Sequence, residues 1–220
     1  MADVEASGAG VTETDFFARA QAKLNLEVPP GLADPNIVPE RGDHDIDPVM
    51  RAIAEVRPIR PAAVLVPVVA RREPSVLLTQ RAAALPDHPG QIAFPGGKIE
   101  LGETPLEAAL RESDEEIGLD RGFIEPIGYL DLYMTTLGYR IVPTLARVLP
   151  GYSTRLNRSE VDDVFEIPLE FLMGPNNHQR HSREWKGMTR TYYAMPFRDR
   201  YIWGVTAGIL RNLYERIYLR

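Results

Sequence analysis

The chain contains no cysteine, and this absence excludes several kinds of site. Without thiols there is no disulfide framework, no cysteine nucleophile and no zinc centre with cysteine ligands. The absence leaves the cellular compartment open.

Long apolar runs are also missing. No segment approaches the roughly 18 consecutive apolar residues that a membrane-spanning helix requires. The first residues, MADVEASGAGVTETD, are acidic and lack the basic and apolar regions of a secretory signal, and the last three, YLR, do not form a peroxisomal address. We therefore expect no membrane partner and a cytoplasmic location.

An excess of positive charge is the third missing feature. The formal net charge is −6, whereas a surface that binds duplex nucleic acid must be basic to meet its phosphates. We therefore expect no nucleic-acid partner, although a local basic pocket for a small phosphorylated ligand is compatible with this charge.

The composition is otherwise that of a globular protein. Hydrophobic residues make up 44% of the chain and charged residues 25%, which is enough to build a core. At 220 residues, the length predicts one domain with extensions. We assign residues 1–56 to an N-terminal extension, partly disordered and with short helices, and residues 57–220 to the main domain.

The extension reads as a series of short segments. Residues 1–10 are expected to be disordered, 14–24 to form an amphipathic helix and 28–47 an extended linker rich in proline, glycine and aspartate. Asp47 and Pro48 are the expected N-cap and first residue of a second helix that continues to about Val56. Packing on the core is the favoured role for the extension; closing over the site or joining a homodimer interface are the alternatives.

The main domain begins with an apolar run bounded by Pro61 and by Arg71, which predicts a buried strand. Strands are expected at residues 62–69, 75–80, 127–133, 140–148 and 184–195, and residues 92–94 lead into the glycine loop at 96–97. A short helix is expected at 168–173, a closing helix at 202–219 and an acidic loop at 157–163. Strands with helices on both sides predict an α/β fold, a three-layer α/β/α sandwich.

The segment from Pro105 to Ile117 has the strongest helix signals in the chain. Thr104 and Glu107 form a capping box, Pro105 suits the first helical position, and Gly118 suits the left-handed stop. A mostly apolar stripe is expected along one side of this helix, made of Leu106, Ala109, Leu110, Ser113 and Ile117.

Three glutamates, Glu112, Glu115 and Glu116, share another face of this helix and are expected to point away from the core. Like charges at this spacing repel, and no lysine or arginine lies three or four positions from Glu112 or Glu116. A hard divalent cation such as Mg²⁺ would relieve the repulsion, because it takes oxygen ligands. A solvated acidic helix face is the alternative.

This stretch resembles the Nudix box, G-x5-E-x7-R-E-U-x-E-E-x-G-U, where U is a bulky apolar residue. The fixed positions are all present, as Gly97, Glu103, Arg111, Glu112, Glu115, Glu116 and Gly118, with Leu119 at the last apolar position. Ser113 stands where an aliphatic residue is usual. The resemblance implies a three-layer sandwich with a central mixed sheet, a cofactor of Mg²⁺ or Mn²⁺, and hydrolysis of a small nucleoside diphosphate derivative.

The resemblance also implies roles for the residues of the box. Glu112, Glu115 and Glu116 would hold the metal, with Glu115 counted among the catalytic residues, and Arg111 would brace the loop through Glu103. Metal ions would reverse the negative field that otherwise repels a polyanionic substrate and would activate a water.

The general base is expected from a further acid outside the box. Members of the family use an acid from a loop or a box glutamate, and here Glu160 is the candidate, with Asp131 and Asp162 as rivals. A solvent-exposed loop acid with no catalytic role is the alternative for Glu160.

The residues before the box resemble a narrower group, the coenzyme A pyrophosphatases of the Nudix family. LLTQRA at residues 77–82 and HPGQIAFPGG at 88–97 follow the pattern L-L-T-x-R-[SA]-x3-R-x3-G-x3-F-P-G-G, except that Pro86 replaces the second arginine. Residues 160–169 and 201–207 also resemble this group. The expected substrate contacts are Arg81, His88, Gly96 and Gly97.

Three functions therefore follow as hypotheses. The first is hydrolysis of coenzyme A or acyl-coenzyme A to 3′,5′-ADP and 4′-phosphopantetheine or its acyl derivative. The second is hydrolysis of another nucleoside diphosphate derivative, such as ADP-ribose, a dinucleotide or a nucleoside triphosphate. The third is a non-catalytic module that binds a nucleotide.

Overall fold

A mixed β-sheet forms the centre of the protein in the computed structural model, which describes residues 12–185 and 187–220. The continuous part of the sheet has the order β1-β7-β8-β2-β3-β4, while β5 pairs with β2, β6 with β8 and β9 with β3. The long central strands β2 and β8 are parallel, and most of the other pairs are antiparallel. The strands are β1 Arg41–Gly42, β2 Arg60–Val69, β3 Ser75–Arg81, β4 Ile92–Ala93, β5 Gly96–Lys98, β6 Ile124–Tyr129, β7 Tyr133–Met134, β8 Tyr139–Val148 and β9 Val161–Pro168.

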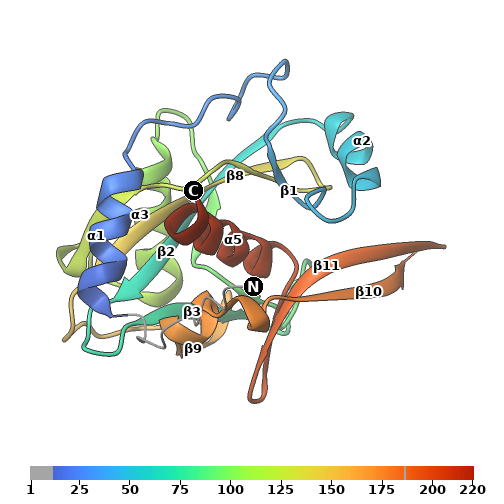
Figure 1. The fold of residues 1–220 in the computed structure, drawn as a ribbon. Helices are drawn as coiled ribbons and strands as arrows, with labels where there is room; N and C mark the ends of the chain where they lie inside the picture. The colour runs from blue at the N-terminus through green and yellow to red at the C-terminus, as the bar shows by residue number, and fades with distance from the viewer. Residues whose placement is uncertain (1–11, 186) are drawn as a thin grey trace, which may run out of the picture.

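Helices cover both faces of this sheet, because successive side chains of β2 point to opposite sides. Ala63 and Leu65 pack in one cluster with the apolar residues of α3 (Pro105–Ile117). Val66 and Val68 pack in the other cluster, with α1 (Glu13–Lys23) and α5 (Val205–Tyr214) (Figure 1). The predicted three-layer α/β/α sandwich with a central mixed sheet is confirmed.

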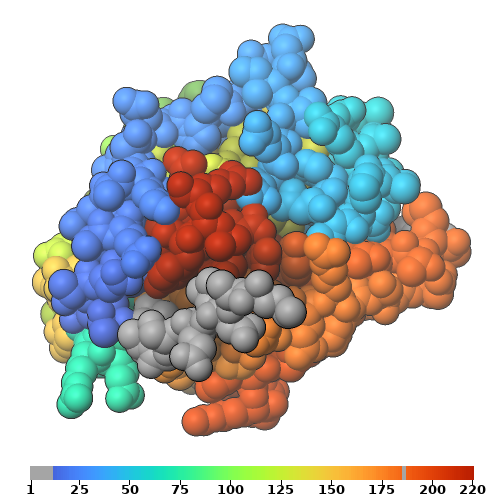
Figure 2. Space-filling model, viewed as in Figure 1, coloured from blue at the N-terminus to red at the C-terminus, as the bar shows by residue number. Residues whose placement is uncertain are grey.

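The N-terminal extension packs on the core, as favoured. Helix α1 forms as predicted and places Phe16 and Ala20 in the fully buried core beside α5. In Figure 2, the blue N-terminal segment lies directly against the red C-terminal helix. Gly42 of β1, within the segment expected to be a linker, pairs with Met134 of β7. The disorder expected at residues 1–10 lies outside the described residues.

The second helix begins differently from its prediction. Helix α2 covers Val49–Glu55, and its N-cap position is Pro48, which makes no side-chain capping bond. The Asp47 carboxylate instead accepts a hydrogen bond from the Thr191 backbone N–H, at 3.3 Å. The prediction of Asp47 as N-cap was wrong, because a tertiary partner takes its carboxylate.

A small antiparallel sheet near the C-terminus departs most from the predictions. It consists of β10 Gln179–Trp185, β11 Met188–Phe197 and β12 Arg200–Trp203, and the β10–β11 hairpin extends away from the body (Figure 1). The helix expected from residue 202 therefore begins at Val205. It ends at Tyr214 and continues as a π-helical turn over Glu215–Leu219.

Two smaller boundaries also differ. The acidic loop expected to end at Asp163 ends earlier, because β9 begins at Val161 and pairs with β3. Helix α4 covers Leu169–Met173, close to its prediction, and 3₁₀ turns cover Arg121–Phe123 and Pro175–Asn177. Among the described residues, no helix has the length and apolar character needed to cross a membrane.

Candidate active site

The floor of the site is the glycine loop that precedes α3. Gly96 and Gly97 belong to β5 and pair with Val64 and Ala63 of β2. A side chain at Gly97 would collide with the Glu112 carboxylate, and one at Gly96 would collide with the β2 backbone. The two glycines therefore allow a carboxylate of α3 to lie against the loop backbone.

The position of α3 is set by the predicted caps. The Thr104 hydroxyl accepts from the Glu107 backbone N–H at 3.3 Å, and the Glu107 carboxylate accepts from the Thr104 N–H at 2.8 Å. At the other end Gly118 has φ +63° and donates to the Asp114 carbonyl at 2.8 Å. Both ends of the helix are confirmed.

The face that α3 buries is rotated from the expected stripe. Ala108 and Glu116 are buried along with Ser113 and Ile117, and Glu116 has only 6% of its surface exposed. The prediction that all three glutamates point away from the core was wrong for Glu116. Ser113 fits in place of an aliphatic residue because its hydroxyl donates to the Ala109 carbonyl of the preceding turn, at 2.7 Å.

Arg111 is the hub of an ion-pair network. Its Nε donates to Glu103 at 2.7 Å, and its Nη1 donates to Glu112 at 2.9 Å and to Glu115 at 3.1 Å. Its Nη2 also donates to the Lys98 carbonyl, at 3.1 Å. The hydrogen bonds that Glu103 accepts from Arg111 first, and from the Glu100 N–H second, lower the pKa of Glu103 to about 2. No lysine or arginine lies three or four positions from Glu112, but the guanidinium of Arg111 reaches this adjacent residue and relieves part of the repulsion.

The carboxylates of Glu112 and Glu116 are poorly solvated because both are partly or largely buried. Burial is the main reason that the pKa of Glu116 rises to about 8, and the charges of Glu112 and Glu160 add to the rise. The pKa of Glu112 is also raised, by burial first, against the opposing effect of Arg111. One hydrogen bond, from the Gly96 N–H at 3.3 Å, reaches the Glu116 carboxylate. Glu112 thus has the Arg111 guanidinium at 2.9 Å, whereas the Glu116 carboxylate is held mainly by burial and a backbone N–H.

Glu160 lies beside these two carboxylates and is held by its surroundings. Its carboxylate accepts from the Asn157 side-chain amide at 3.1 Å, and its carbonyl accepts from the Ala82 N–H at 2.8 Å. Asn157 is itself anchored, because its N–H donates to the Glu116 carbonyl at 2.9 Å. The sequence analysis did not identify Asn157 as a partner of Glu160. Its position three residues before Glu160 was the signal that could have indicated this contact.

The two rival acids are engaged in other contacts. Asp131 pairs with Arg220 at 3.2 Å and with Arg41 at 3.8 Å, so it belongs to contacts that join the two terminal segments to the sheet. The Asp162 carboxylate accepts from the Ala83 backbone N–H at 2.9 Å. These contacts give both rival acids structural partners.

Arg81 ends β3 close to the acids. Its charge acts on Glu116, and its Nε is buried without a hydrogen-bond partner in the described residues. Its backbone is fixed by the following loop, since Arg81 N–H donates to the Gln91 carbonyl and Gly90 N–H to the Arg81 carbonyl. His88 is exposed at the turn of this loop, with φ +56°. Of the expected substrate contacts, Arg81, Gly96 and Gly97 lie by the acids, and His88 lies on the exposed loop.

A model of the NUDIX domain matches residues 59–186, a range that includes this entire arrangement of acids. The chain belongs to the Nudix family. Uncharacterized Nudix hydrolases called NudL, from Escherichia coli O6:H1 and Citrobacter koseri, are both 36% identical to it; the matches cover 72% and 73% of this chain and 83% and 84% of those proteins. A Caenorhabditis elegans Ap4A hydrolase in a binary complex is 24% identical, with a TM-score of 0.41, over 50% of this chain and 80% of that one.

Membership of the Nudix family establishes the general activity. The protein is a pyrophosphohydrolase that cleaves a diphosphate linkage in a nucleoside diphosphate derivative. Nudix hydrolases generally use divalent metal ions, and the residues present suit such an ion. The donors are hard carboxylate oxygens, and Glu116 is a buried acid with a pKa near 8 that a cation would stabilise as its charged form.

The three glutamates that were expected to hold a metal do not form a finished coordination shell. Within residues 12–185 and 187–220, no group of three or more acidic, histidine or cysteine side chains has the geometry to hold a metal ion. Arg111 accounts for part of this, because it holds Glu112 and Glu115, and Glu115 keeps 55% of its side chain exposed at the rim. Metal binding by these two carboxylates would compete with their bonds to the guanidinium at Glu112 Oε1 and Glu115 Oε2.

Proposed function

We propose that this Nudix hydrolase acts on coenzyme A or its acyl derivatives and releases 3′,5′-ADP and 4′-phosphopantetheine or its acyl form. The observation that carries this proposal is the arrangement of residues 77–82 and 88–97, which carry the coenzyme A pyrophosphatase resemblance. Strands β3 and β4 pair these two segments, with Thr79 opposite Ala93 and Gln80 opposite Ile92. The pairing brings Arg81 to the glycine loop and the acids of α3, where a diphosphate must lie to be cleaved.

Glu112, Glu115 and Glu116 would hold Mg²⁺ or Mn²⁺ in this proposal. The ion would supply charge neutralisation for the diphosphate and a lowered pKa for a bound water. Residues of the chain orient the acids and the diphosphate. Arg111, fixed by Glu103, sets the direction of the acids, and the buried Nε of Arg81 is a donor for a phosphate oxygen.

Glu160 is the proposed general base. A water attacks one phosphorus of the diphosphate, its proton passes to the Glu160 carboxylate, and the bond to the bridging oxygen breaks, so no covalent enzyme intermediate forms. The hydrogen bond from Asn157 keeps the carboxylate beside Glu112 and Glu116. Cleavage leaves one phosphate of the diphosphate on each product, and 3′,5′-ADP also keeps the 3′-phosphate that coenzyme A already carries.

The second hypothesis, another nucleoside diphosphate derivative, is retained because of Pro86. This residue is exposed in the loop before His88, where the coenzyme A group has an arginine. The third hypothesis, a non-catalytic module, is not supported, since the chain belongs to a hydrolase family and retains every acid of the box. The cytoplasmic location and the homodimer remain predictions.

The test is a panel of diphosphate compounds, incubated with the protein and Mg²⁺ or Mn²⁺ and analysed by mass spectrometry. We expect coenzyme A to be cleaved to 4′-phosphopantetheine with a higher kcat/KM than ADP-ribose. The Glu112→Gln variant, purified in the same way, controls for contaminating phosphatases. Equal or better turnover of ADP-ribose, with no 4′-phosphopantetheine formed, would overturn the coenzyme A assignment and favour the second hypothesis.

A further inference from the structure

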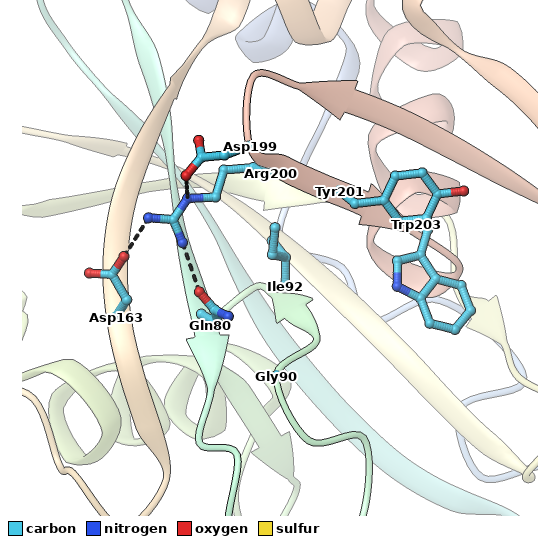
Figure 3. A pocket seen from close by; sticks show the side chains of 8 residues that line it. All are labelled: Gln80, Gly90, Ile92, Asp163, Asp199, Arg200, Tyr201 and Trp203. Carbon is cyan, nitrogen blue, oxygen red and sulfur yellow. Dashed lines mark hydrogen bonds and ion pairs between the residues drawn. The ribbon is translucent and has the colours of Figure 1, made fainter.

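One arginine of the small sheet reaches across to two strands of the central sheet. Arg200 is the first residue of β12 and lines a pocket of about 470 Å³ between the two sheets (Figure 3). Its guanidinium donates to the side-chain oxygen of Gln80 at 2.7 Å and to the Asp163 carboxylate at 2.6 Å. It also lies 4.1 Å from the centre of the Phe165 ring, and a longer contact of 3.9 Å joins it to the exposed carboxylate of Asp199. Arg200 therefore fastens the end of β3 and the beginning of β9 to β12.

The two hydrogen-bond partners of Arg200 lie directly beside a β-bulge. Gln80 of β3 pairs with Asp163 of β9, and the next pair is Arg81 with Val161, so Asp162 is an extra residue in β9. In a regular strand, Val161 would share a face with Asp163. The bulge turns Val161 to the other face, where it packs in the same buried cluster as the apolar residues of α3. Arg200 thus holds both members of the pair at which the register changes.

Two residues of the candidate active site lie immediately beyond this bulge. Arg81 follows the held residue of β3, and its side chain points to the opposite face of the strand, the face that α3 covers. The Glu160 carbonyl accepts from the Ala82 N–H at 2.8 Å, and the Asp162 carboxylate accepts from the Ala83 N–H at 2.9 Å. These bonds tie the two chain segments together beyond the bulge, while Arg200 ties them together on its other side.

We propose that Arg200 is a positioning residue, which keeps the bulge in the shape that directs Arg81 and Glu160 toward the acids of α3. This inference rests on the proposed function, in which Arg81 donates to the diphosphate and Glu160 is the general base, but not on the identity of the substrate. Strand β12 lies beyond residues 59–186, which match the NUDIX domain, so a segment outside that match supports the catalytic centre. Small displacements suffice, because a shift of about 1 Å in a reacting group can lower a rate about 100-fold.

Hydrogen exchange measured by NMR tests the structural half of the proposal without any turnover. Arg200→Gln removes the charge and the forked donor that spans both partners. We expect the amides of Ala82 and Ala83 to exchange at least about tenfold faster in this variant, because their bonds open locally, whereas amides in the middle of β2 should be unaffected. The matched control is Arg198→Gln, which makes the same charge change in the same turn. The Arg198 side chain is exposed over the Phe197 ring, so this variant should exchange like the wild type.

Turnover tests the functional half, using whichever diphosphate compound the wild type cleaves best. Assays well below the Tm of every variant separate positioning from stability, because a purely structural role changes Tm and leaves kcat normal. Arg200→Gln should lower kcat at least about tenfold. In the Glu160→Gln background, the same substitution should lower the residual kcat less than about threefold, because the group that Arg200 positions is already gone. Gln80→Met removes one of the two bonds and should lower kcat by a smaller factor, which keeps the proposal testable if Arg200→Gln does not fold.

Three results would overturn the proposal. They are unchanged exchange of Ala82 and Ala83, normal kcat in a folded Arg200→Gln protein, and an equal loss of kcat in the wild-type and Glu160→Gln backgrounds. Failure of the proposed function gives different results. Normal kcat in Glu160→Gln alone would overturn the assigned general base, and a lack of coenzyme A cleavage would overturn the assigned substrate. In both cases the exchange of Ala82 and Ala83 still decides whether Arg200 holds the bulge.

Discussion

Replacing Glu116 by glutamine should stabilise the metal-free protein at high pH. The pKa of Glu116 is about 8 in the folded protein against an ordinary value of 4.5, so the folded state binds its proton more tightly than the unfolded chain does. Stability is therefore unaffected below about pH 4.5, falls as the pH rises toward 8, and stays reduced above it. At 1.36 kcal/mol per pKa unit, the full loss is at most about 5 kcal/mol.

Glutamine removes this loss, because it cannot ionise and its oxygen can still accept from Gly96. For a chain of this size, a few kcal/mol corresponds to a rise in Tm on the order of 10 °C. Thermal melts of wild type and variant in EDTA, at pH 5, 7 and 9, measure the difference. We expect it to be largest at pH 9 and near zero at pH 5.

The matched control is Glu115→Gln, because Glu115 lies on the same helix with 55% of its side chain exposed. Its Tm should differ little from wild type at any of these pH values. Mg²⁺ added at pH 9 should raise the Tm of the wild type more than that of Glu116→Gln. If Glu116→Gln melts at or below the wild-type temperature at pH 9 in EDTA, burial of the charged Glu116 carboxylate does not destabilise the folded protein as we infer.

Substitutions at four positions test the site further. Glu112→Gln and Glu116→Gln should lower kcat by orders of magnitude with Mg²⁺ present, and near-normal turnover in both variants would contradict the metal-ligand assignment. Arg111→Lys keeps a positive charge but cannot bind Glu103 through two nitrogens, so kcat should fall at least about tenfold with little change in KM; a lysine variant with normal kcat would remove the orienting role. Gly97→Ala should displace the Glu112 carboxylate and weaken Mn²⁺ binding measured by electron paramagnetic resonance, with unchanged affinity as the contrary result.

The sequence predicted the parts of the site that depend on local structure. Thr104 and Gly118 determine where α3 begins and ends, and the spacing of the glutamates determines which of them are neighbours. It did not predict that Glu116 is buried, because burial depends on how the helix packs against β2 and the glycine loop. The contact of Arg111 with Glu112 was missed because helix pairing rules consider residues three and four apart.

The small C-terminal sheet was the least predictable element. Its strands carry polar and aromatic residues on both faces. The sequence therefore lacks the regular alternation of apolar and polar residues that predicts a strand. Ile202 and Trp203 read as the start of a helix, yet they pair with Met195 and Ala194 of β11. Partners far apart in the chain fix this sheet, and single-sequence patterns do not contain them.

The layer made by α1 and α5 has a consequence for how the protein is made. α5 follows every strand of the central sheet in the chain, and the turn after it meets α1 through bonds between Lys23 and Ile217 and between Arg216 and Lys23. During synthesis the sheet and the helix with the acids can leave the ribosome while one apolar face is still bare. The enzyme depends on α5 to cover that face. Until α5 has been made, chaperones that bind exposed apolar surface can bind the uncovered face.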